Sequence, residues 1–269
     1  MTGGARGIGA ATAVQLVRGG ASVALVDRNG PGVERRAAEL GERATAFEAD
    51  VTDPHALDAA VRATVQRFGG LDVVVANAGI SGVVSSVAAI APSDFERVIE
   101  VNLLGVWRTV RATLPHVVER TGYVLAIAST AAALPVPLLA AYAASKAGVE
   151  AFCRSLRMEL AHTGTRVGVG YFSFIDTDMV RDAVAQPIAS QALMAIPGPI
   201  RRPLPVEAAG AAIVRGIQRR AKRVCAPRWV PGLLALRGLS GPLDDLAARH
   251  PRLVRACRMA DSAPTDRLS

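Results

Sequence analysis

A tyrosine and a lysine, Tyr142 and Lys146, form the pair whose residue types and spacing best fit a chemical role. Residues four apart on a helix share one face, so the phenol and the ammonium would be neighbours. A nearby cation stabilises a phenolate, and the pair predicts a general acid/base with a lowered pKa. The chain has only 2 lysines against 29 arginines, which indicates a need for a compact ammonium here. An ordinary surface pair is the alternative.

Two further polar residues lie where they could complete such a site. Ser129 ends an apolar run that predicts a buried strand, and ligands of parallel sheets bind at the carboxyl ends of strands. Its hydroxyl could hydrogen-bond a substrate oxygen, or it could simply cap a turn. Asn102 falls inside a predicted helix, where an amide competes for backbone partners. It predicts a kink or a water site, with a merely tolerated polar residue as the alternative.

The chain begins with a glycine-rich segment, Thr2-Gly3-Gly4-Ala5-Arg6-Gly7-Ile8-Gly9, that is typical of a phosphate-binding turn. Glycines let backbone N–H groups approach a pyrophosphate at the start of the following helix. Asp27 lies eighteen residues after Gly9 at the end of a predicted strand, where its carboxylate can accept the hydroxyls of an adenosine ribose. This favours NAD, because a carboxylate repels the 2′-phosphate of NADP. The adjacent Arg28 could pair with that phosphate, so NADP stays open as the alternative.

A parallel sheet is needed to bring these residues together, and the hydrophobic pattern predicts one. Apolar β-branched runs alternate with helical patterns, as in a doubly wound α/β fold with helices on both faces. The predicted strands are 22–27, 44–50, 71–77, 123–129, 166–171 and 223–227, and the predicted helices are 7–19, 54–68, 92–119, 141–162 and 206–221. We expect one catalytic domain over 1–228, with a proline-rich substrate loop or lid at 180–205, and a basic extension over 229–269.

Composition excludes several classes of protein. A content of 51% hydrophobic and 20% charged residues is that of a globular chain. No apolar run reaches the roughly 18 residues of a membrane span, and no apolar signal segment follows Met1. Three scattered cysteines indicate reduced thiols, and neither His nor Cys clusters with metal-ligand spacing. We therefore expect a cytoplasmic protein without a metal.

The basic excess of the chain is confined to its last part. Residues 1–200 carry 17 Lys and Arg against 18 Asp and Glu, whereas residues 201–269 carry 14 against 5. A solvated arginine-rich surface is the simplest interpretation, and peripheral contact of this region with an acidic membrane surface is the alternative. Nucleic acid is not expected, because aromatic residues for base stacking are only 4% of the chain.

Taken together, the motifs resemble the short-chain dehydrogenase/reductase superfamily over about residues 2–228. The glycine-rich segment, Asp50-Val51, Asn77-Ala78-Gly79, Asn102, Ser129 and Tyr-x-x-x-Lys occur in the order of that family. The resemblance implies a Rossmann-type sheet and hydride transfer between NAD(H) and a secondary alcohol or ketone. It also implies a homodimer or homotetramer formed through the helices at 92–119 and 141–162. An NADP-dependent carbonyl reductase, or a non-catalytic nucleotide- or nucleic-acid-binding protein, is the alternative.

The resemblance implies a role for each matching residue. Tyr142 would be the general acid/base, and Lys146 would lower its pKa and hold the nicotinamide ribose. Ser129 would orient the substrate oxygen, and Asn102 would anchor a water in a proton relay. The expected cofactor contacts are Gly3, Arg6, Gly7, Ile8, Gly9, Asp27, Arg28, Asp50, Val51, Asn77, Ala78, Gly79, Tyr142, Lys146, Ile175 and Thr177.

The chain departs from the family pattern in two places. A Pro-Gly pair usually precedes the position of Ile175, and Phe172-Ser173 stands there instead, which predicts a narrower pocket beside the nicotinamide. Phe172, Phe174 and the apolar residues 131–139 favour a lipophilic substrate. The family also has a central first strand before the glycine-rich segment, where only Met1 precedes Thr2. We expect that strand to be missing, with a misassigned start codon as the explanation.

Overall fold

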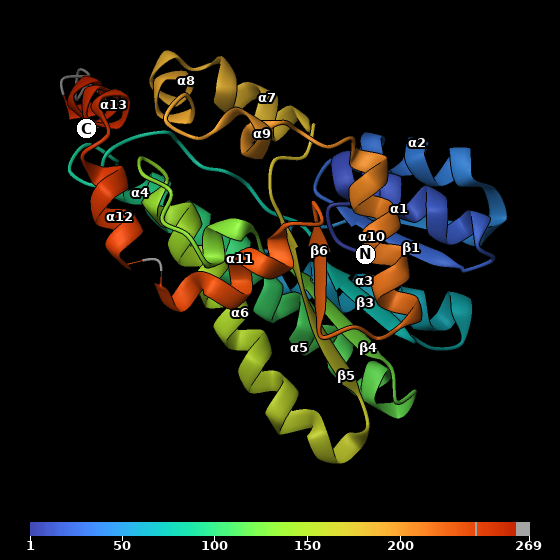
Figure 1. Cartoon of the computed structure of the whole chain (residues 1–269). Helices are drawn as coiled ribbons and strands as arrows, with labels where there is room; N and C mark the ends of the chain where they lie inside the picture. The colour runs from blue at the N-terminus through green and yellow to red at the C-terminus, as the bar shows by residue number, and fades with distance from the viewer. Residues whose placement is uncertain (240, 262–269) are drawn as a thin grey trace.

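Parallel strands in the centre of the molecule carry helices on both faces, as the alternating pattern predicts (Figure 1). The computed structural model describes residues 1–239 and 241–261. Strand β1 (Val23–Asp27) pairs with β2 (Ala44–Glu48). The second sheet has the order β3 (Val73–Ala76), β4 (Tyr123–Ile127), β5 (Arg166–Phe172) and β6 (Arg223–Ala226). All six predicted strands are confirmed, with each end within two residues.

Strand β4 shows why these segments form a sheet interior. All five of its residues are buried, and its register pairs Val124 with Val74 on β3 and with Val167 on β5. A strand covered by helices on both faces needs apolar side chains on both sides, which is why its sequence is an uninterrupted apolar run. The carboxyl ends of these buried strands form one edge, and the residues that follow them meet there.

The two sheets are joined only through the first residues of the described chain. Thr2 bridges to Val26 on β1 and donates its backbone N–H to the Val75 carbonyl of β3. Met1 accepts a hydrogen bond from the Val26 amide, and burial lowers the pKa of its amino group to about 5. Within the described residues no longer strand lies between β1 and β3. The gap between β1 and β3 therefore lies at the position of the central first strand that is expected to be missing.

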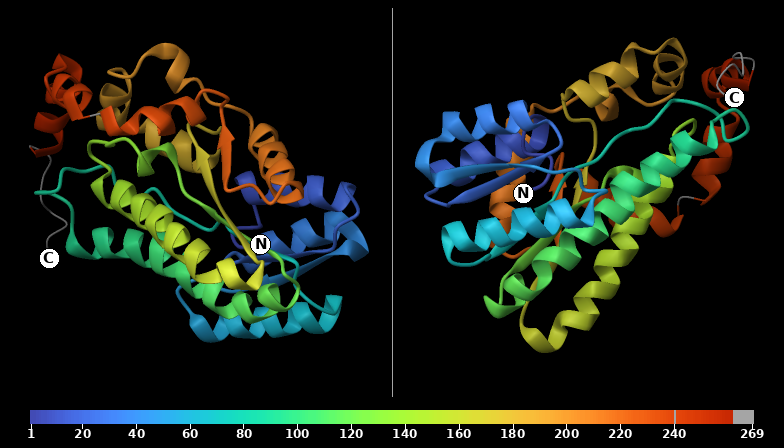
Figure 2. Two further views of the ribbon diagram at one scale, coloured as in Figure 1. Left: turned by 60° about the horizontal axis from the view of Figure 1, so that its bottom comes forward. Right: turned by 180° about the vertical axis from the view of Figure 1, so that it is seen from behind.

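Helices cover both faces of the sheets (Figure 2). One face carries α1 (Gly7–Arg18), α2 (Gly30–Leu40) and α10 (Val206–Gln218), and the other carries α3 (Pro54–Phe68), α4 (Pro92–Ile99), α5 (Gly105–Glu119) and α6 (Ala140–Glu159). The five predicted helices are confirmed, but the segment 92–119 is interrupted by a π-helical turn at Glu100–Leu104. Helix α2 is absent from the predicted helices, because its Gly-Pro-Gly start resembles a turn. The Asn29 side chain caps it by accepting the Gly32 amide at 3.1 Å.

The sequence predicts a loop or lid over residues 180–205, and the structure shows that most of this segment is helical. It contains most of α7 (Asp178–Ala185), all of α8 (Pro187–Leu193) and all of α9 (Gly198–Arg201). Prolines stand in the first turns of α8 and α9, where a missing N–H breaks no helical hydrogen bond. The three short helices form an arch beyond the carboxyl ends of the strands, shown in gold in Figure 1. We call this segment, 178–201, the lid.

The basic extension is helical as far as the structure describes it. It contains α11 (Val230–Leu236), a 3₁₀ turn at Arg237–Leu239, α12 (Gly241–Ala248) and α13 (Pro251–Asp261). Residue 240 and residues 262–269 of the predicted extension lie outside the described part. None of the helices described is long and apolar enough to cross a bilayer.

Candidate active site

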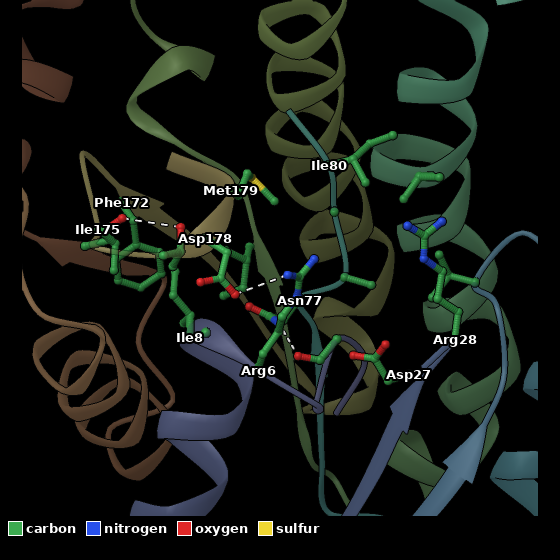
Figure 3. Close-up of a pocket in the computed structure, with 18 of the residues that line it drawn as sticks. Arg6, Ile8, Asp27, Arg28, Asn77, Ile80, Phe172, Ile175, Asp178 and Met179 are labelled. Atoms are coloured by element: carbon green, nitrogen blue, oxygen red, sulfur yellow. Dashed lines mark hydrogen bonds and ion pairs between the residues drawn. The ribbon is translucent and has the colours of Figure 1, made fainter. Parts of the chain in front are cut away.

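One pocket at the carboxyl edge of the strands gathers residues from distant parts of the chain (Figure 3). Every predicted cofactor contact except Gly9 lines it. Figure 3 shows Asp27 and Arg28 at one end of the pocket and Phe172 and Ile175 at the other. The residues expected at the adenosine end and those expected at the nicotinamide end therefore lie at opposite ends of one pocket.

The glycine-rich segment is shaped by contacts that leave no room for side chains. Gly3 has a φ of +67°, and a Cβ there would lie 2.8 Å from Nδ2 of Asn77. A Cβ on Gly9 would collide with the carbonyl oxygen of Gly3, so a glycine at this position lets the helix pack closely against the turn. The Asn77 amide donates to the carbonyl oxygens of Thr2 (3.0 Å) and Gly3 (3.2 Å). This narrow backbone cradle at the start of α1 fits a dinucleotide pyrophosphate.

Asp27 is held in place by the backbone around it. Its two carboxylate oxygens accept the amides of Ala5 and Asn29, each at 3.0 Å. Both interactions fix the carboxylate at the pocket wall, where it remains able to accept ribose hydroxyls. Arg28 lines the same end, and its side chain is exposed. This end of the pocket thus contains both the Asp27 carboxylate, which favours NAD, and the Arg28 side chain, which would favour NADP.

Asp50 carries an ion pair that the sequence analysis missed. Its Oδ1 accepts hydrogen bonds from the amide (2.9 Å) and hydroxyl (2.8 Å) of Thr52, and Arg97 lies 3.3 Å from Oδ2. Partial burial raises the pKa of Asp50, but the Thr52 hydrogen bonds and the Arg97 charge outweigh it and lower the pKa. Arg97 also lines the pocket. No local motif marks it, because it comes from α4, far from Asp50 in the sequence.

Tyr142 and Lys146 lie together on α6, as their spacing predicts. The Lys146 ammonium is 5.7 Å from the centre of the Tyr142 ring and donates to the Ile127 carbonyl at 3.0 Å. Burial lowers the pKa of Lys146 to about 8. It also raises the pKa of Tyr142, against a smaller lowering by a hydrogen bond with Ser129. The expected lowering of the tyrosine pKa is therefore wrong, because desolvation is the larger effect.

Ser129 caps a turn, which is one of the two roles that the sequence left open, and its hydroxyl also reaches the Tyr142 phenol. Its Oγ accepts the Ala131 amide at 3.1 Å, which caps a short turn, and donates to the Phe172 carbonyl at 3.3 Å. The same hydroxyl forms the hydrogen bond with the Tyr142 side chain. Ser129 therefore lies directly at the phenol, close to where a substrate oxygen would bind.

Asn102 lies in the π-helical turn and is completely buried. Its Oδ1 accepts the Ile80 amide at 2.8 Å, and its Nδ2 donates to the Ile80 carbonyl (2.9 Å) and to the Ser145 hydroxyl (3.1 Å). The π-helical turn stands where a kink or a water site is predicted, and the side chain connects the segment after β3 to α6. These contacts position the helix of Tyr142 and Lys146.

Apolar side chains line part of the pocket. They include Ile80, Phe172, Ile175, Met179 and Val180. The sequence analysis identified Phe172 and Ile175 but missed the others, which come from a loop and from the lid. Phe174 is half-buried and is not part of the pocket lining.

The lid also contacts the glycine-rich segment directly. Nη1 of Arg6 lies 3.1 Å from Oδ2 of Asp178, the first residue of α7. The other Asp178 oxygen pairs with Arg181 at 2.6 Å. Both arginines lower the pKa of Asp178, with the Arg181 hydrogen bond as the largest cause. Among the residues described, no group of His, Cys, Asp and Glu has the arrangement of a metal site.

Comparison with known proteins identifies the family of this chain. The family profile of short chain dehydrogenases matches residues 1–187. A 1-deoxy-11-beta-hydroxypentalenate dehydrogenase of Streptomyces exfoliatus is 38% identical over 191 residues, covering 69% of this chain and 70% of that protein. A (-)-trans-carveol dehydrogenase of Rhodococcus erythropolis is 33% identical over 199 residues, covering 68% and 72%.

A solved structure extends the likeness to three dimensions. The 3-ketoacyl-(acyl-carrier-protein) reductase of Brucella melitensis, complexed with NADH, superposes with a TM-score of 0.71 and 30% identity. The match covers 84% of this chain and 94% of that one. The chain belongs to the short-chain dehydrogenase family, and it is an NAD(P)-dependent oxidoreductase.

Proposed function

We propose that the protein oxidises a lipophilic secondary alcohol to a ketone with NAD, using Tyr142 as the general base. The observation that carries this proposal is that Tyr142 and Lys146 line the same pocket as Asp27, with Ser129 hydrogen-bonded to the Tyr142 phenol behind that lining. The bound dinucleotide supplies a hydride acceptor. The described residues of this chain supply binding, orientation and a route for the hydroxyl proton.

Each side chain has a definite task in this reaction. The Ser129 hydroxyl orients the alcohol oxygen, and the Tyr142 phenolate removes its proton as the carbon–hydrogen bond breaks. Lys146, whose ammonium lies beside the Tyr142 ring, holds the nicotinamide ribose. Asn102 fixes the turn beside α6 and anchors a water of the proton relay.

The substrate class follows from the walls of the pocket. Phe172 is the last residue of β5, and Ile175 lies just after that strand. Met179 and Val180, on α7, extend the apolar surface along the lid. Such a wall favours an apolar substrate body around one polar carbon. Two of the relatives are named for pentalenate and carveol substrates, which supports the same class.

Cofactor binding is tested by the thermal unfolding of the protein with NAD⁺, NADH, NADP⁺ and NADPH. Because Asp27 repels a 2′-phosphate, we expect a clear rise in Tm with NAD(H) and a smaller one with NADP(H). A ligand at 100 times its Kd stabilises the folded state by about 2.7 kcal/mol. A larger shift with NADP(H) would favour the alternative, an NADP-dependent carbonyl reductase that uses Arg28.

Catalysis is tested with Tyr142→Phe, which removes the phenolic oxygen and little else. General-base catalysis contributes about 10²–10⁴-fold, so we expect kcat to fall by that factor in alcohol oxidation. The rise in Tm with NAD⁺ should persist, which shows that the variant is folded and binds the dinucleotide. Turnover close to that of the wild type would exclude Tyr142 as the base.

A further inference from the structure

A carboxylate and a guanidinium meet at the end of the cofactor pocket where Figure 3 shows Asp27. Strands β1 and β2 are paired side by side, and the Ala49 amide donates to the Asp27 carbonyl at 3.0 Å. Asp50, the next residue, therefore lies close to the carboxylate that is expected to hold the adenosine ribose. Asp50 and Arg97 both line the pocket. The base attached to that ribose would bind at this end, beside this pair.

The walls of this end suit a flat ring. Four aliphatic residues line the pocket and belong to one buried apolar cluster, namely Val26, Ala49, Val51 and Val101. A planar base can bury its faces against such side chains, whereas the polar atoms at its edge need hydrogen-bonding partners. Asp50 and Arg97 bring charged groups to these apolar walls, so they can contact the edge of a base.

The two oxygens of the Asp50 carboxylate are used unequally. Oδ1 accepts hydrogen bonds from both the amide and the hydroxyl of Thr52. Within the described chain, Oδ2 accepts a hydrogen bond only from Arg97, at 3.3 Å. A carboxylate oxygen can accept two hydrogen bonds, so Oδ2 keeps room for one donor from a ligand. Because the pKa of Asp50 is lowered, the group is ionised at neutral pH and can only accept.

Stability alone does not explain the ion pair. The side chains of Arg97 and Asp50 are 42% and 32% exposed, and ion pairs at such exposure contribute little to the free energy of unfolding. The effect of the pair on geometry is larger. Thr52 holds one carboxylate oxygen and Arg97 holds the other, so the two contacts together fix the plane of the carboxylate. Through Arg97, helix α4 reaches the adenosine end of the pocket.

We propose that Arg97 is a positioning residue that acts through Asp50 and makes the pocket selective for a 6-aminopurine base. With its plane fixed, the Asp50 carboxylate accepts a hydrogen bond from the exocyclic amino group of adenine. Hypoxanthine has a carbonyl oxygen at that position, which is an acceptor and is repelled by the carboxylate. The inference rests on the binding of a dinucleotide and is independent of the alcohol substrate proposed above.

The test compares NAD⁺ with nicotinamide hypoxanthine dinucleotide, in which a carbonyl replaces the amino group of adenine. Isothermal titration calorimetry gives both Kd values without any turnover. We expect the wild type to bind NAD⁺ about tenfold more tightly, because the analogue lacks a hydrogen bond to a charged group. Arg97→Met removes the charge and keeps an unbranched side chain. It should lower the ratio of the two Kd values to about threefold or less, mainly by weakening the binding of NAD⁺.

A second variant tests whether Arg97 acts through Asp50. Asp50→Ala should abolish the preference for NAD⁺. Adding Arg97→Met to Asp50→Ala should then change the ratio no further, because the group that Arg97 positions is gone. The matched control is Arg62→Met, since Arg62 is exposed on α3 and does not line the cofactor pocket. It should leave both Kd values within about twofold of those of the wild type.

The outcomes separate this inference from the proposed function. A wild type that binds both dinucleotides equally, or binds neither, would overturn the inference, and so would an unchanged ratio in Arg97→Met. A further change of the ratio in the double variant would also overturn it, because Arg97 would then contact the base directly. A wild type that prefers NAD⁺ over the analogue but oxidises no secondary alcohol would refute the proposed function and leave the inference supported.

Discussion

Two effects shift the pKa of the Tyr142 phenol in opposite directions. Burial raises its pKa, and the hydrogen bond with Ser129 lowers it by a smaller amount. The other tyrosines, Tyr123 and Tyr171, also have raised pKa values, with burial as the largest cause. We therefore expect the native protein to show little tyrosinate absorbance at pH 10. The unfolded chain should be about half ionised there, because a free tyrosine has a pKa of about 10.

The measurement is an ultraviolet pH titration of the native and the urea-unfolded protein. Tyr142→Phe identifies the contribution of the catalytic residue. A native titration step below pH 10 that disappears in this variant would show that the charge of Lys146 outweighs burial after all.

Lys146 provides a second test at the scale of one residue. Its pKa is lowered from 10.5 to about 8 by burial, so between these pH values the unfolded state binds more protons than the native state. The free energy of unfolding should therefore rise with pH across this window, by roughly 3 kcal/mol in total. Lys146→Met should lack this rise and should be the more stable protein below pH 8, despite losing the bond to the Ile127 carbonyl.

Urea unfolding of both proteins at several pH values between 7 and 10 measures this difference. Tyr142 titrates in both, so its contribution cancels in the comparison. Parallel stability curves for the two proteins would mean that the Lys146 ammonium is not desolvated in the folded state.

At the scale of elements, the π-helical turn depends on one buried amide. Asn102→Ala leaves the amide and carbonyl of Ile80 without their side-chain partner and removes a bond to Ser145. Buried groups left without a partner cost about 1–3 kcal/mol each. We expect Asn102→Ala to lower the free energy of unfolding by at least about 2 kcal/mol, measured by urea unfolding.

The matched control is Glu119→Ala, at the exposed end of the same helical segment. It should change stability by less than about 0.5 kcal/mol. If Asn102→Ala were equally harmless, the turn would be held by the backbone alone, and Asn102 would have no positioning role.

The elements also show which parts of the fold a sequence can predict. Buried strands such as β4 and long helices such as α6 are recognisable, because their apolar pattern is repeated over many residues. Short helices such as α8 are not, because a proline that starts a helix resembles one in a loop. The ion pairs of Arg97 and Asp178 also escape prediction, since their partners, Asp50 and Arg6, are distant in the sequence. Local motifs identify the cofactor residues, whereas the lid side depends on tertiary contacts.

At the scale of the whole molecule, two long helices expose apolar side chains that a monomer would leave in water. Trp107 on α5 is 43% exposed and Met158 on α6 is 73% exposed. Both helices pack on the sheet through their opposite faces, with Val110 and Val149 in the same buried cluster. Their outer surface is therefore available to a second copy of the chain. We propose that the protein is a homodimer or homotetramer formed through this surface.

Trp107→Glu tests this assembly by placing a charge where apolar contact is needed. A stable interface buries roughly 800 Å² on each partner, and an unpaired charge at its centre costs several kcal/mol. Sedimentation velocity should show the wild type at a multiple of 27.9 kDa and the variant shifted toward the monomer. The control is Leu236→Ser, which alters an even more exposed apolar residue (63%) on α11 and should leave the mass unchanged. Because Trp107 is absent from the cofactor pocket, the Tm shift with NAD⁺ should survive in the variant, and a monomeric wild type would refute the assembly.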